Sequence, residues 1–311
     1  MKTSLVMAVY NGEKYIFEQI ESIYLQTRKI DEVIFFDDGS SDLTVKIIKD
    51  FIKDRNIDNW TVYCNKHNKG WEKNFFDGIM LAKNDVIFLS DQDDIWHHDK
   101  IEKMMNAFET NDNIWVLVCG YNQFNNSGRQ FFSYQCDSAK EKIRRLDFTE
   151  DYYYTEYPGC SMAFLQSITP YIRDCWSEKT PHDGIIWTLS KLVGKLYVYD
   201  EVLFEQRRAG NNASLKIAHD YRYKLNDVYR VKKINSWYRE SVFYDEKMEK
   251  LLKDIETWTN LRIKLLVNHN PIAWFALFKY KSFYHSNRQY VGDIYYYFEA
   301  LKNDSRKKVI K

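Results

Sequence analysis

Three aspartates occur within four residues, at Asp91, Asp93 and Asp94. They follow residues 86–89, a short apolar run of β-branched and aromatic side chains that predicts a buried strand. Alternation along an extended backbone would place Asp91 and Asp93 on one face, and Gln92 and Asp94 on the other. Two carboxylates on one face repel each other unless a cation lies between them, and hard oxygen ligands suit Mg²⁺ or Mn²⁺. The motif therefore predicts a divalent-metal site at a strand end, with coordination positions left open for substrate phosphates.

An ordinary helix N-terminus is the alternative interpretation of these acidic residues. Asp94 would then cap a helix over residues 96–108. Capping accounts for one aspartate and leaves the other two unexplained. We expect His97 and His98 to be solvated residues of the first helical turn, because the carboxylates already provide ligands for a cation, and Trp96 to be a packing anchor.

The elements that must position this motif alternate between strands and helices. Residues 4–9 and 32–36 are apolar runs that predict buried strands, and an amphipathic helical pattern over residues 15–24 separates them. Strand–helix–strand units of about 30 residues are typical of a parallel sheet, and ligands bind outside the carboxyl ends of its strands. The loops that follow the strands should therefore converge on one sheet edge, at residues 8–12, 37–42 and 91–94.

Two of the loops near this edge carry residues suited to a nucleotide. Asp37 or Asp38 can accept a hydrogen bond from a ligand, such as the N3–H of a pyrimidine. The structural alternative is a turn built on Gly39 that leads into a helix. After a third predicted strand, Lys73 either reaches a phosphate or belongs to a solvated loop and cap. No G-x-G-x-x-G follows the first strand, which argues against a dinucleotide-binding fold.

The composition is that of a globular chain of 311 residues, with 29% charged and 45% hydrophobic residues and a net charge of +1. From Asn211 to the end, 20 Lys and Arg face 11 Asp and Glu. Five cysteines without C-x-x-C spacing argue against a disulfide framework or zinc site and favour a reducing compartment. No run approaches the ~18 apolar residues of a membrane span. We therefore expect a cytoplasmic protein, with peripheral contact to the inner membrane face as an alternative.

Four segments match, in order and spacing, the motifs of one enzyme family: SLVMAVYNGEKY, VIFFDDGSSDLT, NKGWEKNFFDGI and FLSDQDDIWHHDKIE. Over about residues 3–215 the chain resembles family 2 glycosyltransferases, and the later stretches GCSMAF and PHDGIIW extend the likeness. DQDDIW with the later HD and Trp is most similar to bacterial members that build surface polysaccharide, including rhamnosyltransferases. The resemblance implies an α/β fold of GT-A type, with a mostly parallel central sheet flanked by helices.

The resemblance also implies a role for each matching residue. Asp91 and Asp93 would bind Mn²⁺ or Mg²⁺, with Asp93 the more direct ligand, and Asp183 would be the catalytic base. The nucleotide-sugar donor would contact Ala8, Tyr10, Asn11, Asp37, Asp38, Asn68, Gly70, Lys73, Gln92, Arg207 and Arg208. The acceptor side would include Gly159, Cys160, His182 and Trp187, and the tyrosines at 152–154 and 157 would line an acceptor pocket or simply pack.

The chain departs from the family pattern over residues 206–214. The segment resembles a YR-x-H-G-x-N-x-S motif that closes over the donor, but its tyrosine is Gln206 and its histidine is Ala209. The departure leaves Arg207 or Arg208 as the phosphate-binding residue and puts in doubt any contact that the histidine would have made.

The implied reaction has clear chemical requirements. Displacing a nucleoside diphosphate from a sugar needs charge neutralisation on the leaving group, a base for the acceptor hydroxyl and in-line geometry. Asp183 supplies the base if it lies across the sugar from the metal, and a single displacement inverts the anomeric centre. The alternative for Asp183 is an N-cap of a helix over residues 185–193. By resemblance the donor is dTDP-rhamnose or a UDP-hexose, and the acceptor is a saccharide or a lipid-linked saccharide.

The chain divides into a catalytic domain, residues 1–215, and a helical, basic, tyrosine-rich region, residues 216–311. Apolar residues at heptad-like spacing over residues 248–265, interrupted by Arg262, predict either a helix packed on its own catalytic domain or a homodimer seam. Residues 272–281 combine aromatic rings with lysines, which suits the surface of an anionic membrane. No nucleic-acid motif is present, and the catalytic half is acidic, so we expect no nucleic-acid partner.

Two other functions compete with a transferase. A nucleotidyltransferase would show a Gly-rich, basic phosphate loop after the first strand, and AVYNGEKY is not one. A sugar-nucleotide-binding or scaffold protein without catalysis would not need Asp91, Asp93 and Asp183 together.

Overall fold

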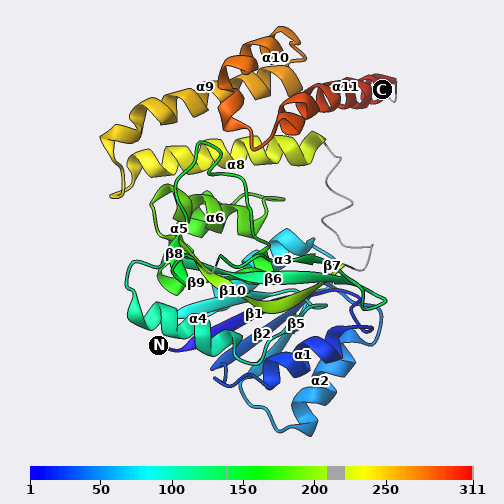
Figure 1. Ribbon diagram of the computed structural model, residues 1–311. Coiled ribbons are helices and arrows are strands. Elements are labelled where there is room, and N and C mark those ends of the chain that lie inside the picture. Colours follow the sequence, from blue (N-terminus) through cyan, green and yellow to red (C-terminus); the bar gives the residue numbers. More distant parts are fainter. Residues whose placement is uncertain (138, 209–220, 310–311) are drawn as a thin grey trace.

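The computed structural model describes residues 1–137, 139–208 and 221–309, and in this part of the chain one mixed sheet of ten strands forms the centre of the molecule (Figure 1). The strand order is β3-β2-β1-β4-β9-β6-β10-β5, and β7 and β8 pair with β6 and β10. The strands are β1 Thr3–Val9, β2 Glu32–Asp37, β3 Trp60–Cys64, β4 Val86–Ser90, β5 Ile95–Trp96, β6 Val116–Asn125, β7 Gln130–Ser133, β8 Ile143–Arg145, β9 Met162–Leu165 and β10 Leu196–Arg208.

The central sheet is mostly parallel, as predicted. Strands β3, β2, β1 and β4 pair in parallel, and β10 pairs in parallel with β6. The short strand β9 runs antiparallel to both β4 and β6, so it joins two parallel groups that point the same way. The carboxyl ends of the long strands therefore lie along one edge.

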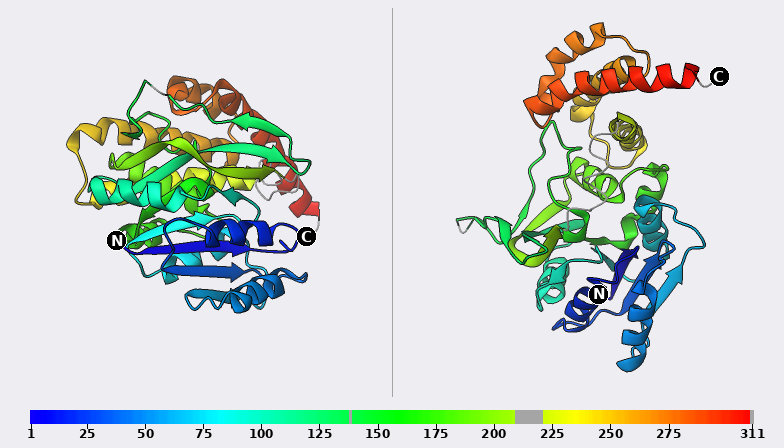
Figure 2. Two further views of the ribbon diagram at one scale, coloured as in Figure 1. Left: turned by 60° about the horizontal axis from the view of Figure 1, so that its bottom comes forward. Right: turned by 90° about the vertical axis from the view of Figure 1, so that its right-hand side faces the viewer.

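Helices cover both faces of the sheet because the strand residues alternate between two cores. Leu5 and Met7 face one core with α1 Ile16–Tyr24, α2 Thr44–Asp54 and α4 Lys100–Thr110, whereas Val6 faces the other. The second core contains α3 Trp71–Leu81, α5 Thr169–Cys175 and α6 His182–Leu192. Figure 2 shows the helices on the two faces.

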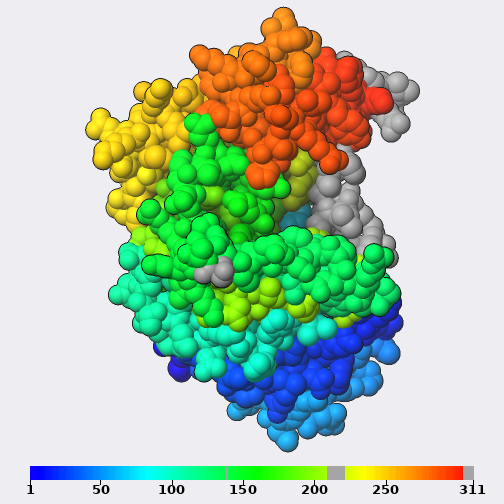
Figure 3. Space-filling view, in the orientation of Figure 1, coloured from blue at the N-terminus to red at the C-terminus, as the bar shows by residue number. Residues whose placement is uncertain are grey.

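The C-terminal helices are α8 Tyr221–Glu240, α9 Glu249–Leu266, α10 Ile272–Leu277 and α11 Asn287–Val309. Of these, α8 packs on α5 and α6, and the other three lie beyond it and extend the second core away from the sheet (Figures 1 and 2). In the space-filling view, the green surface of the middle of the chain meets the orange surface of these helices (Figure 3). The predicted boundary at residues 215 and 216 falls in the segment 209–220, outside the described residues.

The predicted heptad-like pattern in the C-terminal region packs inside the molecule. Ile255, Trp258 and Leu265 are at most 1% exposed, and Arg262, which interrupts the pattern, is also buried. These side chains face α8, α10 and α11 of the same chain. Within the described residues, no helix is both long enough and apolar enough to cross a membrane.

The predicted helix over residues 96–108 begins later than expected. Ile95 and Trp96 pair with β10 as strand β5, and the helix α4 starts at Lys100. Asp94 does not cap this helix, because its Oδ1 accepts a hydrogen bond from the backbone amide of Arg207 (3.2 Å). His97 therefore lies outside the first helical turn, and its Nε2 contacts Glu205 (3.1 Å).

Candidate active site

An acidic cluster lies just beyond the carboxyl end of β4. One ligand-type atom from each of Asp91, Asp94 and Cys160 lies within 4.8 Å of the others. The chain bends at Gln92 and Asp93 and does not continue as an extended strand. The predicted alternation, with Asp94 on the face opposite Asp91, is therefore wrong. Asp94 is 1% exposed and lies beside Asp91, and both Asp91 and Asp93 are partly exposed.

The carboxylates of this cluster resist joint ionisation. Burial raises the pKa of Asp91, and burial together with the charge of Asp91 raises the pKa of Asp93 to about 7. The pKa of Asp94 lies well above its usual value, because burial and the charges of Asp91 and Asp93 act in the same direction. A bound cation would relieve the repulsion among the three groups.

The donor atoms fit a hard divalent cation such as Mn²⁺ or Mg²⁺. Asp94 Oδ2 is buried and has no hydrogen-bond partner among the described residues. Burial raises the pKa of the Cys160 thiol well above its usual value, so the sulfur stays protonated and is a poor ligand for such an ion. Asp91 and Asp94 are therefore the carboxylates that this geometry brings together to hold a metal, and Asp93 lies beside them in the chain.

A buried lysine lies beneath the cluster, and the sequence analysis missed it. Lys100 is fully buried, its Nζ donates to the carbonyl oxygen of Cys160 (2.9 Å), and it lies 3.8 Å from the ring centroid of Trp96. Burial lowers the pKa of Lys100, whereas the neighbouring thiols and carboxylates, including Asp94, act in the opposite direction. A signal was present, because Lys100 occupies the same helical stripe as the core residue Met104.

The loop after β1 is fixed onto the acidic motif by a glutamine. Gln92 Oε1 accepts from the amide of Tyr10 (2.8 Å), and its Nε2 donates to the carbonyl oxygen of Tyr10 (3.1 Å). A side chain at Gly12 would collide with Gln92. Asn11 takes a positive φ of 46°, and its Oδ1 accepts from the amide of Ser41 (2.9 Å). Tyr10 remains 47% exposed at this edge.

The two aspartates after β2 are buried and bind backbone amides. Ala8, at the end of β1, lies beside this strand end in the sheet. Asp37 accepts from the amides of Gly39 (3.2 Å) and Ser40 (3.1 Å). Asp38 is 2% exposed. Its carboxylate accepts three hydrogen bonds from the loop after β3, donated by Lys69 N (2.8 Å), Gly70 N (2.9 Å) and Asn65 Nδ2 (3.0 Å). Each carboxylate still has lone pairs for a ligand.

The loop after β3 is shaped by Asp38, and its predicted phosphate-binding lysine points elsewhere. Asn68 Oδ1 accepts from the amide of Gly70 (3.1 Å), and Gly70 has a positive φ of 90°. Lys73 pairs with Asp77 one turn along α3 and lies 5.4 Å from the ring centroid of Trp176. Lys73 is therefore an ion-pair partner on the helix surface in this structure.

Arg207 and Arg208, at the end of β10, differ in their contacts. The guanidinium of Arg207 donates to Glu18 (2.6 Å) and to the carbonyl oxygen of Asp93 (3.1 Å), so it holds the acidic loop in place. The charges of Arg207 and, to a smaller extent, Arg208 lower the pKa of Asp93, and the charge of Arg208 lowers that of Asp91, in each case against the larger effect of burial. Of the two, Arg208 is the better candidate for a phosphate, because Arg207 is already paired with a carboxylate.

The residue before these arginines, Gln206, contacts Cys160 of the acidic cluster. Gln206, which stands where the family motif has a tyrosine, is 5% exposed and donates from Nε2 to the sulfur of Cys160 (3.5 Å). Ala209 and the remainder of the motif, to residue 214, lie outside the described residues.

Asp183 lies in the first turn of α6, where Pro181 is the N-cap residue. The predicted N-cap role is therefore wrong, and Asp183 Oδ1 accepts from the amide of Gly184 (2.7 Å). A Cβ placed on Gly159 would lie 3.2 Å from the Cβ of Asp183. Gly159 and Cys160 belong to one turn, η1 Gly159–Ser161, so a single turn contacts both Asp183 and the acidic cluster. Asp183 also acts on the cluster directly, because burial and, to a smaller extent, the charge of Asp183 raise the pKa of Asp91.

The other residues assigned to the acceptor side are largely buried. His182 is 3% exposed, and its ring stacks on Phe75 at a centroid distance of 4.2 Å. Burial lowers the pKa of His182 to about 4, so the imidazole is neutral at physiological pH. Trp187 is fully buried and stacks on Tyr157. Tyr152 is also fully buried, which makes it a packing residue.

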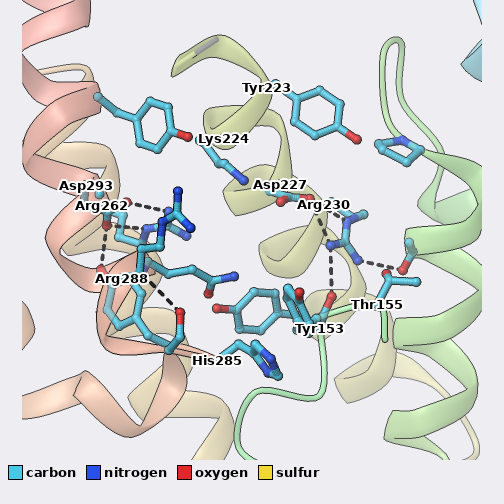
Figure 4. A pocket seen from close by; sticks show the side chains of 18 of the residues that line it. Tyr153, Thr155, Tyr223, Lys224, Asp227, Arg230, Arg262, His285, Arg288 and Asp293 are labelled. Atoms are coloured by element: carbon cyan, nitrogen blue, oxygen red, sulfur yellow. Dashed lines mark hydrogen bonds and ion pairs between the residues drawn. The ribbon is translucent and has the colours of Figure 1, made fainter. Parts of the chain in front are cut away.

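A cavity of about 730 Å³ opens beside Asp183, between the first turn of α6 and the C-terminal helices (Figure 4). Its walls include Tyr153 and Tyr154 from the middle of the chain, Tyr223 from α8 and Tyr295 from α11. The tyrosines at 152–154 were expected either to line an acceptor pocket or to pack, whereas no side chain of α8 or α11 was expected at a pocket. No local pattern marks those side chains, because only the packing of the helices brings them to Asp183.

Comparison with known proteins adds a family and a fold. Residues 4–170 match the family model described as glycosyl transferase family 2. An uncharacterized glycosyltransferase of Haemophilus influenzae is 26% identical over 279 residues, which are 81% of this chain and 83% of that protein. The dTDP-rhamnosyl transferase RfbG of Shigella flexneri is 26% identical over 253 residues, 76% of this chain and 82% of RfbG.

The fold is also similar to that of solved structures. The crystal structure of S. aureus TarS 1-349 in complex with UDP-GlcNAc superposes with a TM-score of 0.64 and 18% sequence identity. The superposition covers 91% of this chain and 82% of that chain. It supports the GT-A arrangement of the central sheet.

Proposed function

Because this chain belongs to glycosyl transferase family 2 and is a glycosyltransferase, we propose that it moves a sugar from a nucleoside diphosphate donor to a saccharide acceptor. In this proposal the transfer depends on Mn²⁺ or Mg²⁺ and inverts the anomeric centre. The product is a bacterial surface polysaccharide.

The observation that carries the proposal is the position of turn η1. Its Cys160 contacts the acidic cluster, and its Gly159 packs against Asp183. The candidate metal site and the candidate base therefore both border one short turn. In the proposed in-line displacement, the leaving group departs toward the metal and the acceptor approaches from Asp183.

Asp183 is the residue that we assign as base. It is partly exposed, it lines the cavity, and its second oxygen remains available while Oδ1 accepts from Gly184. It would take the proton from the acceptor hydroxyl as the oxygen attacks the anomeric carbon. A divalent ion on Asp91, Asp93 and Asp94 would neutralise charge on the diphosphate leaving group.

The donor is proposed from the sheet edge and from the relatives. The name of the Shigella relative gives dTDP-rhamnose, and the TarS complex contains UDP-GlcNAc. Both are pyrimidine nucleotides, whose base presents an N3–H donor to a carboxylate such as Asp37 or Asp38. We therefore propose dTDP-rhamnose or a UDP-hexose as donor, with Tyr10 and Asn11 beside the nucleoside and Arg208 near the diphosphate.

The C-terminal region supports a contact with an anionic membrane. Ile272, Phe275 and Phe278 are 73%, 69% and 64% exposed, and Lys279 and Lys281 follow directly. Apolar side chains beside lysines suit a membrane interface with negative lipids. Flotation with vesicles containing phosphatidylglycerol tests this contact, because a protein that stays unbound at low salt would exclude it.

The first experiment on the proposed function is a thermal-shift screen of UDP, dTDP, GDP and CDP, with and without Mn²⁺. A ligand that binds only the native state at a hundred times its Kd adds about 2.7 kcal/mol of stability. We expect one or both pyrimidine diphosphates UDP and dTDP to raise the Tm when Mn²⁺ is present. No shift with any nucleotide in the presence of metal would contradict the proposal.

A further inference from the structure

The cavity beside Asp183 has an excess of positive charge that the proposed catalytic groups do not use. Two of its arginines are neutralised within the protein, since Arg230 pairs with Asp227 (3.0 Å) and Arg262 pairs with Asp293 (2.8 Å). Both arginines are at most 6% exposed. They build the walls of the cavity and are not available to a ligand.

Two further cations line the cavity without a carboxylate partner. Within the described residues, neither Lys224 of α8 nor Arg288 of α11 forms an ion pair, and the contact found for Lys224 is with the ring of Tyr296, 6.0 Å from its centroid. A ring nitrogen of His285, which also lines the cavity, contacts Asp151 (2.8 Å). In Figure 4, Tyr223, Asp227 and Arg230 of α8 lie on one side of the cavity, and Arg288 and Asp293 of α11 lie on the other.

The remaining lining side chains suit a sugar. Tyr154, Tyr223 and Tyr295 offer ring faces for the C–H surfaces of a pyranose, and Gln289 offers an amide for its hydroxyls. A volume of about 730 Å³ is large enough for a saccharide of more than one ring. Because Asp183 also lines the cavity, a sugar bound here would present its hydroxyl to the proposed base.

We propose that this cavity is the acceptor site and that the acceptor is a phosphorylated saccharide whose phosphate binds Lys224 and Arg288. The inference rests on the proposed function, because it takes Asp183 as the base that activates the acceptor. Two cations from different helices match a group with two negative charges, and guanidinium and ammonium groups are both common phosphate ligands. The catalytic domain thus supplies the base, and the C-terminal helices supply the recognition of the acceptor.

The experiment measures binding of glucose 1-phosphate by calorimetry, with the donor site filled by Mn²⁺ and the nucleoside diphosphate that stabilises the protein in the screen. The double variant Lys224→Ala, Arg288→Ala removes the two cations. The matched control is Lys253→Ala, Lys302→Ala, which removes the same charge from α9 and α11 at positions that do not line the cavity. Methyl glucoside serves as the uncharged probe.

We expect the double variant to bind glucose 1-phosphate at least tenfold more weakly than wild type, because it loses two charge-assisted hydrogen bonds to the phosphate, and tenfold corresponds to about 1.4 kcal/mol. The control variant should bind it as wild type does. The binding of methyl glucoside should not distinguish the three proteins. Unchanged Tm values and an unchanged nucleotide-induced shift would show that the fold and the donor site remain intact.

Several outcomes would overturn the inference while leaving the proposed function in place. One is a wild-type protein that binds the nucleotide but not glucose 1-phosphate, or that binds it equally well after both substitutions. Another is tighter binding of glucuronic acid than of glucose 1-phosphate, which would replace the phosphate by a carboxylate. A third is a loss confined to binding of phosphatidylglycerol vesicles, which would make the two cations a lipid contact. Failure of the nucleotide to bind wild type would instead contradict the proposed function.

Discussion

The two sides of the candidate site, the sheet edge and the cavity, are built by different kinds of contact. On the sheet edge, the carboxylates of Asp37 and Asp38 are held by backbone amides of the loops that follow β2 and β3. On the cavity side, side chains far apart in the sequence hold the walls, as in the pair Arg262–Asp293 and the hydrogen bond from Tyr153 to the carbonyl oxygen of Phe283. The sheet edge therefore depends on local sequence, and the cavity depends on helix packing.

This difference suggests that the sheet edge and the cavity are suited to different ligands. Backbone amides that bind a carboxylate keep their geometry when nearby side chains change, so the sheet edge is suited to a ligand that does not vary, such as a nucleotide. Walls made of side chains on α8 and α11 can be altered without disturbing the sheet, so the cavity is suited to the partner that defines the product. The predictions below separate the two sides by their effects on activity, stability and binding.

The largest effect is expected from Asp183→Asn, which keeps the shape of the side chain but removes the base. Loss of a general base lowers the rate by about 100- to 10,000-fold. Release of nucleoside diphosphate from the donor, with water as the acceptor, measures the rate. The nucleotide-induced thermal shift in the presence of Mn²⁺ should persist, because Asp183 is not among the residues proposed to bind the metal or the nucleotide. Removing its charge also lowers the pKa of Asp91, which favours the ionised carboxylate.

The matched control for that variant is Glu72→Gln. Glu72 is a second partly buried carboxylate near Asp183, and burial, with a smaller contribution from Asp183, raises its pKa. We expect its rate to remain within a few-fold of wild type. Equal losses in the two variants would contradict the assignment of Asp183 as the base, and an unchanged rate in Asp183→Asn would favour a protein that binds sugar nucleotides without transferring the sugar.

The next effect concerns the stability of the cavity walls. Arg262 makes two hydrogen bonds of 2.8 Å to the carboxylate of Asp293, and both residues are buried. Arg262→Met leaves that carboxylate without its counter-ion, which costs about 3–5 kcal/mol of unfolding free energy. Urea unfolding measures the loss.

A double variant tests the cause of that loss. Arg262→Met with Asp293→Leu removes both charges, so it should recover most of the lost stability, because an apolar pair of similar volume is often tolerated in place of a buried ion pair. If the double variant is as unstable as the single one, the loss comes from packing and not from the unpaired charge. Neither variant should change the nucleotide-induced shift at the sheet edge.

The sheet edge could be predicted from the sequence because each signal is local. Apolar runs followed by Asn11, Asp38 and Asp91 marked strand ends, and the order of strands and helices gave a parallel sheet. The errors came from backbone turns that no pattern encodes. Asp94 lies on the same side as Asp91 because the chain bends at Gln92 and Asp93. Its Oδ1 accepts a hydrogen bond from the amide of Arg207 at the end of β10.

The cavity could not be predicted, for a physical reason. Lys224 and Asp183 are brought together by the burial of Arg230, which donates from α8 to the carbonyl oxygens of Gly184 (2.6 Å) and Tyr153 (3.1 Å). A basic residue in a basic region is expected to have a solvated side chain. The residues beside Arg230 in the sequence give no sign that its guanidinium bridges α8 and α6.

A smaller effect, of about 3 kcal/mol, is expected from Asp38→Ala, because hydrogen bonds to a charged group contribute about 1.5–3 kcal/mol each and water replaces part of them. The variant leaves the amides of Lys69 and Gly70 without their acceptor. Urea unfolding measures the loss, and the nucleotide-induced shift should disappear with it. Binding of glucose 1-phosphate, measured without nucleotide for both this variant and wild type, should persist, and its loss would contradict the independence of the two sides.

The smallest effect is a pH dependence of the unfolding free energy that comes from His182, which lies beside Gly159 of η1. Burial lowers the pKa of His182 to about 4, against an ordinary value near 6.5, and the charge of Asp183 opposes that shift only in part. Below pH 6.5 the unfolded chain therefore takes up a proton at this residue, whereas the folded protein does not. The unfolding free energy consequently decreases as the pH is lowered, until the folded pKa is reached. Between pH 7 and pH 5 the loss is about 2 kcal/mol.

The variant His182→Phe can stack on Phe75 in the same way but does not titrate, so it isolates this contribution. Its unfolding free energy in urea should fall less than that of wild type between pH 7 and pH 5, by about 2 kcal/mol. Above pH 7 the two proteins should show parallel pH profiles, because the imidazole is neutral in both the folded and the unfolded state. Equal slopes in the acid range would mean that the imidazole is protonated in the folded protein as well. The turn between the sheet edge and the cavity would then be open to water at His182.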